Sequence, residues 1–329
     1  MRAVLQYRAS AGFRARLREQ APGWLNVSIV DDTDAGAIYR ELADADVLLH
    51  VLAPVTAKLL ESAPKLRLVQ KIGVGVNTID IEAARRLGIA VANMPGTNSQ
   101  AVAEHTLALM MASLRCIAYL DVSTKSGHGW QLTPETFDET GQLCGRTVGF
   151  IGYGSVPRRL TAPLLALGAK VVYYARKPAA DDGAMWISSL EGLLCKADVV
   201  SLHLPLTSET WGLLDAEALR TMRPGAVLIN TARGELVDEV ALADALRTRR
   251  IAAAGLDVFA VEPVITGNPL LSLSNVVATP HIAWLTPETL DRSINVIIEN
   301  CRRLRDGGGC SIRSSAGLSG KSLGRMALT

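Results

Sequence analysis

Apolar and polar positions alternate with two different periods along the first third of the chain. Short apolar runs, rich in β-branched residues, predict strands at residues 2–6, 25–30, 47–51, 66–72 and 89–92. The stretches between them repeat apolar residues with helical spacing, at 11–19, 35–42, 57–62 and 81–87. Strands that alternate with helices in this way indicate a parallel sheet covered by helices.

A long helix follows this first half and leads to a second half of the same kind. Residues 93–96 signal a turn, Asn98 or Ser99 is placed to cap the helix, and its apolar positions continue to about residue 117. The polar segment 125–144 is interpreted as a connection. Further strands are predicted at 147–151, 170–174, 198–202, 226–230, 252–257 and 275–278. The pattern predicts two doubly wound α/β halves, with a last helix at 287–305 that is long enough to return to the first.

Composition is that of an ordinary globular protein. The chain has 329 residues, 49% of them hydrophobic and 20% charged, which is enough for two domains with buried cores. A net charge of +2 and 5% aromatic residues favour neither nucleic acid nor an acidic membrane as a partner. No apolar run is long enough to span a bilayer, and the N-terminus lacks the apolar core of a signal peptide. Five cysteines without a close CxxC pair predict neither disulfides nor a metal site, so we expect a cytoplasmic protein.

A glycine turn between the strand at 147–151 and a helix at 158–167 suggests a nucleotide site. Gly152 allows a tight turn, and Gly154 lets a pyrophosphate approach the backbone where the helix begins. Pro157 stands where this fingerprint has glycine or alanine, which removes an N–H group and adds bulk. An ordinary glycine turn is the alternative, but the strand before it and the helix after it favour dinucleotide binding.

The end of the next strand decides which dinucleotide is predicted. NAD-binding proteins of this type place Asp or Glu about 20 residues after the glycines, where it binds the ribose hydroxyls. Here the chain has Arg176 and Lys177, and no carboxylate until Asp181. Two cations suit the 2′-phosphate of NADP(H). We therefore expect NADP(H) to be preferred, with NAD(H) left open and a solvated basic turn as the structural alternative.

Three ionisable residues, Arg233, Glu262 and His281, follow three successive predicted strands. Open parallel sheets bind ligands at the carboxyl ends of their strands, which is where these side chains emerge. An imidazole, with an ordinary pKa near ~6.5, can protonate an alkoxide, and a carboxylate can orient its ring. A guanidinium group binds a carboxylate through paired donors. The pattern predicts an enzyme that reduces a 2-keto acid, with Asp257 as a candidate to bind the nicotinamide carboxamide.

Each of these residues also has an ordinary structural interpretation. An arginine after a strand is usually part of a surface ion pair, a glutamate before proline is usually solvated, and a histidine after Thr-Pro can simply bond to the backbone. Their placement at successive strand ends favours catalysis. Among the other histidines, we expect His203 to be packed and His105, beside Glu104 on the long helix, to be structural.

The order of these motifs resembles that of the D-isomer-specific 2-hydroxyacid dehydrogenases over roughly residues 40–300. The shared motifs are GVGVNTID at 73–80, NMPGTN at 93–98, VAE at 102–104, the glycine turn and the three segments with ionisable residues. The resemblance implies a flavodoxin-like catalytic domain, residues 1–98 and 286–306, and an inserted Rossmann NAD(P)-binding domain, residues 99–285. It also implies an oxidoreductase of the EC 1.1.1 type and a homodimer joined through the nucleotide domain. The apolar helix 101–117 fits that interface, or else the core.

The resemblance further implies a role for individual residues. Arg233 is expected to hold the substrate, Glu262 to support the base, and His281 to act as general acid and base. The backbone N–H groups of Val74 and Gly75 are expected to bind the substrate carboxylate. Contacts with the cofactor are implied for Thr97, Gly152, Gly154, Ser155, Val156, Ala175, Arg176, Lys177, Thr231, Ala232 and Asp257.

Within this family, the two cations after the second strand look most like the glyoxylate/hydroxypyruvate reductases that prefer NADPH. Three features depart from the family pattern: Pro157, Asn77 in place of an aspartate, and a Gly/Ser-rich tail, residues 307–329, expected to be disordered. Three functions stay open. They are an NADP(H)-linked reductase of small 2-keto acids, an NAD-linked D-3-phosphoglycerate or D-lactate dehydrogenase, and a non-catalytic dinucleotide-sensing protein.

Overall fold

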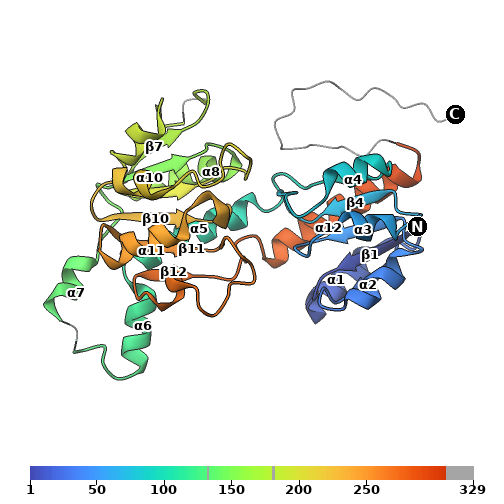
Figure 1. Ribbon diagram of the computed structural model, residues 1–329, viewed down its shortest axis with the longest axis horizontal. Coiled ribbons are helices and arrows are strands. Elements are labelled where there is room, and N and C mark those ends of the chain that lie inside the picture. The colour runs from blue at the N-terminus through green and yellow to red at the C-terminus, as the bar shows by residue number, and fades with distance from the viewer. Residues whose placement is uncertain (132, 180–181, 309–329) are drawn as a thin grey trace. The chain divides into compact units, whose positions relative to one another are not determined.

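The computed structural model describes residues 1–131, 133–179 and 182–308, and within it the chain divides into two compact units. The first unit contains Met1–Thr97 and the described residues from Leu290 on, and the second contains Asn98–Thr289 (Figure 1). The disorder predicted for the tail falls almost entirely on residues 309–329, which lie outside the described residues.

The first unit is built on a parallel five-stranded sheet with the order β2-β1-β3-β4-β5. Its strands are β1 (Arg2–Gln6), β2 (Asn26–Val30), β3 (Val47–His50), β4 (Leu68–Lys71) and β5 (Ala90–Ala92). The helices that connect them are α1 (Ala11–Gln20), α2 (Ala35–Leu42), α3 (Ala57–Glu61) and α4 (Ile81–Arg86). This strand order is that of flavodoxin-like folds.

Local sequence explains where these four helices begin. A side chain just before each helix accepts a hydrogen bond from a backbone N–H of the first turn; these residues are Ser10, Asp34, Thr56 and Asp80. Each bond satisfies a donor that has no partner inside the helix. The final helix, α12 (Pro287–Arg305), joins the unit from the far end of the chain. There Asn300 Nδ2 donates to Gln70 Oε1 at 2.6 Å, and both side chains are buried.

The second unit is built on a parallel seven-stranded sheet with the order β12-β11-β10-β9-β6-β7-β8. Its strands are β6 (Thr147–Ile151), β7 (Lys170–Tyr174), β8 (Met185–Ile187), β9 (Val199–Leu202), β10 (Ala226–Asn230), β11 (Ile251–Leu256) and β12 (Val276–Ala278). Helices and turns between them are α8 (Ser155–Ala166), α9 (Leu190–Leu194), α10 (Ala216–Thr221), η1 (Gly234–Leu236), α11 (Glu239–Arg247) and η2 (Pro269–Ser272). The chain reverses its direction across the sheet between β6 and β9, which is the usual ligand-binding position of such folds. The predicted α/β class with two parallel sheets is confirmed.

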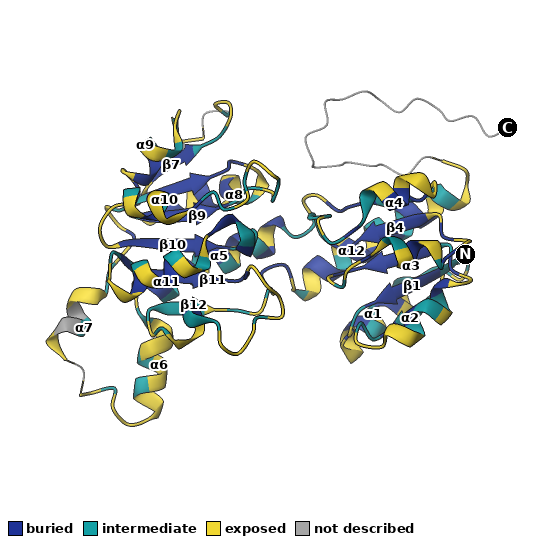
Figure 2. Ribbon diagram, viewed as in Figure 1, coloured by how far each residue is buried: buried dark blue, intermediate teal, exposed yellow. Residues whose placement is uncertain are grey.

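Apolar clusters cover both faces of this sheet, and the strands are the most buried part of the second unit (Figure 2). The helix α5 (Ser99–Leu114) packs on one face, against β10 and β11, and buries residues along most of its length. The continuous helix predicted to residue 117 is wrong. Cys116 adopts a left-handed conformation with φ 51°, and a separate helix, α6 (Ile117–Lys125), leaves at 63° to α5. Because a left-handed residue cannot continue an α-helix, the apolar pattern alone runs past the break.

Two short elements differ from the sequence expectation. The segment interpreted as a connection contains the helix α7 (Pro134–Glu139) and the end of α6. The edge strand β8 was not predicted, because three residues are too few to show a period. Among the described helices, none is by itself long and apolar enough to cross a membrane, while α5 and α6 reach that length only as a bent pair.

Candidate active site

The three predicted catalytic residues follow three neighbouring strands of the second unit. Strands β10, β11 and β12 pair in parallel, and their last residues, Asn230, Leu256 and Ala278, are aligned in register. Arg233, Glu262 and His281 therefore emerge from loops at the same edge of the sheet. This is the carboxyl edge, where parallel α/β sheets bind their ligands.

His281 and Glu262 form a hydrogen-bonded pair. His281 Nδ1 lies 2.6 Å from Glu262 Oε2, and the two side chains are 20% and 31% exposed. The other carboxylate oxygen of Glu262 accepts from the N–H of Phe259 at 2.9 Å, which fixes the carboxylate on its own loop. A carboxylate on Nδ1 orients the ring and leaves Nε2 for a second partner. The pair has the arrangement expected of a general acid with its orienting group.

Arg233 belongs to a tightly packed turn beside the Glu262 loop. A Cβ atom on Gly234 would lie 1.9 Å from the carbonyl carbon of Phe259, so only glycine permits this approach of the two loops. Arg233 Nη1 donates to the carbonyl of Ala232 at 2.6 Å. Burial lowers the pKa of Arg233, while the charges of Glu235 and Glu262 act in the opposite direction. The guanidinium thus lies within the electrostatic reach of the carboxylate that holds His281.

Asn230, which was not predicted to be a functional residue, holds the turn that carries Arg233. Its side chain, 1% exposed, donates from Nδ2 to the carbonyl of Arg233 at 2.7 Å and accepts from the N–H of Ala232 at 3.0 Å. Both bonds are local, because Asn side chains readily bridge backbone groups in turns. The Asn-Thr-Ala-Arg-Gly motif was a signal for this turn, since Asn at a strand end is a common turn residue.

Asp257 lies at the end of β11 with a carboxylate that is already engaged by protein groups. It is 1% exposed; Oδ1 accepts from Thr279 Oγ1 at 2.6 Å and from Ile282 N at 2.9 Å, and Oδ2 accepts from Ala283 N at 2.9 Å. Burial raises the pKa of Asp257, but hydrogen bonds, that of His105 first among them, outweigh it and hold the pKa below its ordinary value. The carboxylate therefore holds the loop of His281. This role was not predicted from the sequence, which suggested only a contact with nicotinamide.

The helix α5 supplies two side chains to the same edge of the sheet. His105 Nε2 lies 2.9 Å from Thr279 Oγ1, after β12, and Thr106 Oγ1 lies 2.9 Å from Thr231 Oγ1, after β10. His203, in contrast, packs against Phe150 with ring centroids 5.3 Å apart, and burial lowers its pKa to about 3. The motif positions of α5 did signal the family, but not which of its side chains face the site.

The glycine turn leads from β6 into α8 as the sequence predicts. Gly152 has φ 91°, and a Cβ atom there would lie 2.6 Å from the carbonyl oxygen of His203, so glycine is required. Gly154 caps α8 and has open space where a Cβ would be. Ser155 and Val156 begin the helix, and Pro157 occupies its first turn, where its missing N–H costs no intrahelical bond. These residues fit a pyrophosphate at the start of a twelve-residue helix.

The end of β7 presents two exposed cations beside the glycine turn. Arg176 and Lys177 are exposed, and no described carboxylate lies within ion-pair distance of either. Asp182, the next described carboxylate, instead accepts from Tyr153 Oη at 2.6 Å. Ala175 is held by its carbonyl, which accepts from Trp186 Nε1 at 3.0 Å. The predicted ribose end of the cofactor site is therefore positively charged.

Three predicted contacts, Val74, Gly75 and Thr97, lie in the first unit. Val74 and Gly75 follow β4, and their N–H groups have no acceptor among the described residues. The carbonyl of Val74 accepts from Asn93 Nδ2 at 2.8 Å, and that of Gly73 accepts from Met94 N at 2.8 Å. Two backbone carbonyls are thus held, while the adjacent N–H donors stay available for an anion.

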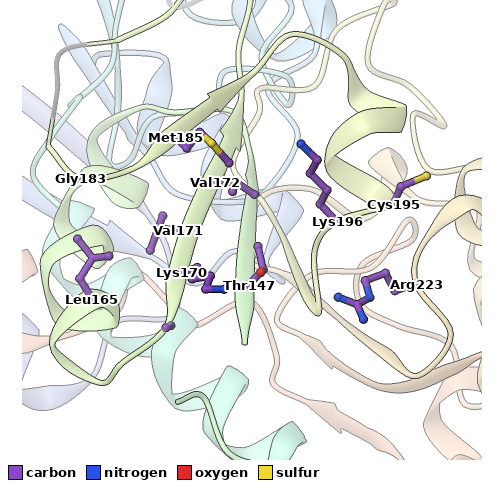
Figure 3. A pocket seen from close by; sticks show the side chains of 11 residues that line it. Thr147, Leu165, Lys170, Val171, Val172, Gly183, Met185, Cys195, Lys196 and Arg223 are labelled. Atoms are coloured by element: carbon purple, nitrogen blue, oxygen red, sulfur yellow. The ribbon is translucent and has the colours of Figure 1, made fainter. Parts of the chain in front are cut away.

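A hollow of about 600 Å³ lies at the opposite end of the seven-stranded sheet (Figure 3). Its lining includes Thr147 and Lys170, the first residues of β6 and β7, together with Lys196 and Arg223. It therefore lies at the amino edge of the strands, away from the residues described above. The candidate site is therefore assigned from the polar groups at the carboxyl edge and not from the size of a hollow.

Known proteins resemble this chain in sequence and fold. The family model for the D-isomer specific 2-hydroxyacid dehydrogenase NAD binding domain matches residues 107–283. A D-3-phosphoglycerate dehydrogenase of Mycobacterium leprae is 42% identical over 84% of this chain and 52% of its own length. A glyoxylate reductase of Korarchaeum cryptofilum is 37% identical over 80% of both chains. The structure of an NADPH-dependent glyoxylate/hydroxypyruvate reductase from Sinorhizobium meliloti, with NADP and malonate, superposes with a TM-score of 0.81, at 28% identity over 94% of this chain and 95% of that one.

The chain spans about half the length of the mycobacterial relative that it matches. The matched region nevertheless includes the glycine turn and the segments with Arg233, Glu262 and His281. The family resemblance inferred from the motifs is confirmed by these matches.

Proposed function

Because the chain belongs to the D-isomer specific 2-hydroxyacid dehydrogenases, we propose that it transfers a hydride between a nicotinamide dinucleotide and the C2 position of a small 2-keto or 2-hydroxy acid. The pair of His281 and Glu262, 2.6 Å apart at the carboxyl edge of the second unit's sheet, carries the proposal. We take this unit as the nucleotide domain and the first unit as the catalytic domain.

The proposed mechanism divides the work between the cofactor and three side chains. The bound nicotinamide supplies or accepts the hydride. His281 delivers a proton from Nε2 to the substrate oxygen, because Nδ1 is engaged by Glu262. Glu262 orients the ring, and a protonated imidazole is the form that donates in the reductive direction. Arg233 binds the substrate carboxylate through its paired N–H groups.

The remaining contacts belong to the same proposal. We propose that the N–H groups of Val74 and Gly75 bind the substrate carboxylate. Gly152, Gly154, Ser155 and Val156 hold the pyrophosphate at the start of α8, and Thr97, Ala175, Thr231, Ala232 and Asp257 line the rest of the cofactor. We place the reaction in the cytoplasm, because the described cysteines are thiols, as is usual in a reducing compartment.

NADP(H) is the cofactor that we propose, with NAD(H) as the weaker alternative. Arg176 and Lys177 stand where a carboxylate would bind the ribose of NAD, and both are exposed at the end of β7. Charge-assisted hydrogen bonds from these cations suit a 2′-phosphate. The structure of the Sinorhizobium reductase that contains NADP supports this choice by similarity.

Assays with four keto acids and both reduced cofactors test the proposal. We expect NADPH oxidation with glyoxylate or hydroxypyruvate, followed by absorbance at 340 nm. Turnover that requires NADH and phosphohydroxypyruvate or pyruvate would instead favour the alternative of a D-3-phosphoglycerate or D-lactate dehydrogenase. Tight cofactor binding without turnover on any of the four would contradict the enzyme assignment and favour a dinucleotide-sensing protein.

Replacing Arg176 with aspartate is expected to move the cofactor preference toward NADH. The change removes a cation from the 2′-phosphate and introduces an acceptor for the ribose hydroxyls, so kcat/KM for NADPH should fall about tenfold or more. The measurement is the ratio of kcat/KM for the two cofactors. Lys196→Asp, on an exposed residue at the opposite edge of the sheet, is the matched control. An unchanged ratio in Arg176→Asp would remove the case for NADP(H).

We also propose a homodimer, with its interface on α6 and the residues that follow it as far as Trp130. None of the α6 side chains is buried, and Ile117, Val122 and the nearby Trp130 are 51%, 67% and 88% exposed. The helix α5, which the sequence offered as the interface, buries much of its surface within its own unit. Exposed apolar side chains gathered on one element are typical of an interface between subunits.

Val122→Asp is expected to convert the dimer to monomer. A carboxylate placed within an apolar interface is desolvated without a partner, which costs several kcal/mol. Light scattering after size-exclusion chromatography measures the mass. Val240→Asp, on α11 and 69% exposed, is the control and should leave the mass unchanged. A wild-type protein that is monomeric at micromolar concentration would contradict the proposal at once.

A further inference from the structure

His105 joins the helix α5 to the loops after β11 and β12. Its Nε2 atom lies 2.9 Å from Thr279 Oγ1 and 3.5 Å from Asp257 Oδ1. Thr279 Oγ1 in turn lies 2.6 Å from Asp257 Oδ1. The three polar groups form a closed network next to the loop that carries His281. His105 has no part in the proposed transfer of hydride and proton.

The direction of the hydrogen bonds in this network is determined by Asp257. Its carboxylate is held in the charged form by hydrogen bonds that keep its pKa low despite burial, so it can only accept. The single hydroxyl proton of Thr279 must therefore point to Asp257 Oδ1. Thr279 Oγ1 can then only accept from His105, which means that Nε2 of His105 carries a proton and donates.

The network ends on the backbone of the proposed general acid. Asp257 accepts from the N–H groups of Ile282 and Ala283, both at 2.9 Å, and its carbonyl accepts from His281 N at 2.8 Å. His281 has φ 55°, a left-handed conformation that a residue with a side chain keeps only where its surroundings impose it. Asp257 holds the backbone here, because it accepts from His281 and from the two residues that follow, and in this conformation the His281 ring contacts Glu262.

We propose that His105 is a positioning residue of the catalytic site, which acts through Thr279 and Asp257 to hold His281 in the orientation for proton transfer. The inference rests on the proposed function, because it presupposes that His281 is the general acid. His105 donates to the loop network and does not itself transfer the proton. Its helix thereby connects the core of the unit to the reacting edge.

The substitution that tests this role is compatible with folding. The side chain of His105 is 22% exposed, so leucine can take its place without filling a closed core position. His105→Leu removes the donor, whereas His105→Gln keeps an N–H group close to the position of Nε2. If His105 contributed by packing alone, keeping the N–H donor in the glutamine variant would not restore activity.

Steady-state kinetics of His105→Leu and His105→Gln provide the first measurement. The leucine variant is expected to lower kcat about tenfold or more, since it removes a hydrogen bond from a network that ends on a charged group. KM for the keto acid and Kd for the dinucleotide should change less than about threefold, because neither is bound by His105. The glutamine variant should recover most of kcat. Glu104→Leu, the neighbouring exposed position on α5, is the control and should behave as wild type.

A double-mutant cycle with Thr279→Val provides the second measurement. If His105 acts through the Thr279 hydroxyl, adding His105→Leu to Thr279→Val should lower kcat by less than about twofold further. Multiplicative losses, absence of rescue by glutamine, or a wild-type kcat in His105→Leu would each overturn the inference. The proposed function is tested separately by His281→Ala. An inactive His281→Ala beside a fully active His105→Leu rejects only the positioning role, whereas an active His281→Ala rejects both.

Discussion

Replacing His281 with alanine is expected to lower kcat/KM for keto-acid reduction by about a thousandfold, since positioned proton transfer contributes roughly 10²- to 10⁴-fold. The structure supports this expectation through one contact in particular. Glu262 engages Nδ1 at 2.6 Å and leaves Nε2 as the nitrogen that can reach a substrate oxygen. Alanine removes the donor, and a water molecule in its place lacks the orientation that Glu262 provides.

The measurement is steady-state kinetics combined with a fluorescence titration of the reduced cofactor. Binding of the cofactor should be retained, because the pyrophosphate residues that we propose lie on α8 and its glycine turn. His128→Ala, an exposed histidine after α6, is the matched control and should keep wild-type activity. If His281→Ala retains most of its kcat/KM, the role of proton donor is wrong, and so is the mechanism built on it.

The second large effect is expected at Arg233. Arg233→Ala should lower kcat/KM by about a hundredfold or more, because truncating one member of a charged hydrogen-bonded pair costs roughly 2–5 kcal/mol. Arg233→Lys should recover little, since an ammonium group cannot match the paired, planar donors of guanidinium. Both variants should raise KM for the keto acid as well as lower kcat, because the group binds the substrate and polarises its carbonyl.

Added guanidinium at millimolar concentration provides a specific check on Arg233→Ala. Partial recovery of activity there, without recovery in Arg233→Lys, would support direct contact with the substrate. Arg223→Ala is the matched control, because Arg223 is half exposed at the opposite edge of the sheet, where it pairs with Asp198 at 3.1 Å. Wild-type KM and kcat in Arg233→Ala would contradict the role of substrate anchor.

The elements of this fold were largely predictable, because their signals are local. The strands β1, β6, β7 and β10 have the predicted bounds, since each is a short, mostly apolar run. The helix α2 also has its predicted bounds, with Asp34 as its cap. Where prediction failed, the signal was absent or misleading. The edge strand β8 is too short to show a period, and the apolar pattern of α5 continues past the left-handed residue that ends it.

The candidate site, like the fold, was predictable from the sequence only in part. Arg233, Glu262 and His281 were predicted from their positions after apolar strands, but the contact between Glu262 and His281 depends on how their loops fold. Asp257 was predicted to bind the nicotinamide carboxamide, which stays a prediction, and the structure adds that its carboxylate binds the loop of His281. Thr279 was not predicted to have a role, because a single hydroxyl residue gives no signal in the sequence until its neighbours in space are known.

The sequence by itself determined the two-part α/β architecture, the family and the candidate catalytic side chains, because periodicity and short motifs are properties of neighbouring residues. Only the tertiary structure decided which groups orient these side chains. Parallel pairing brings the ends of β10, β11 and β12 into register, and α5 adds His105 and Thr106 from a distant part of the chain. Hydrogen bonds between residues far apart in sequence depend on distance and direction in space, and no linear pattern records either.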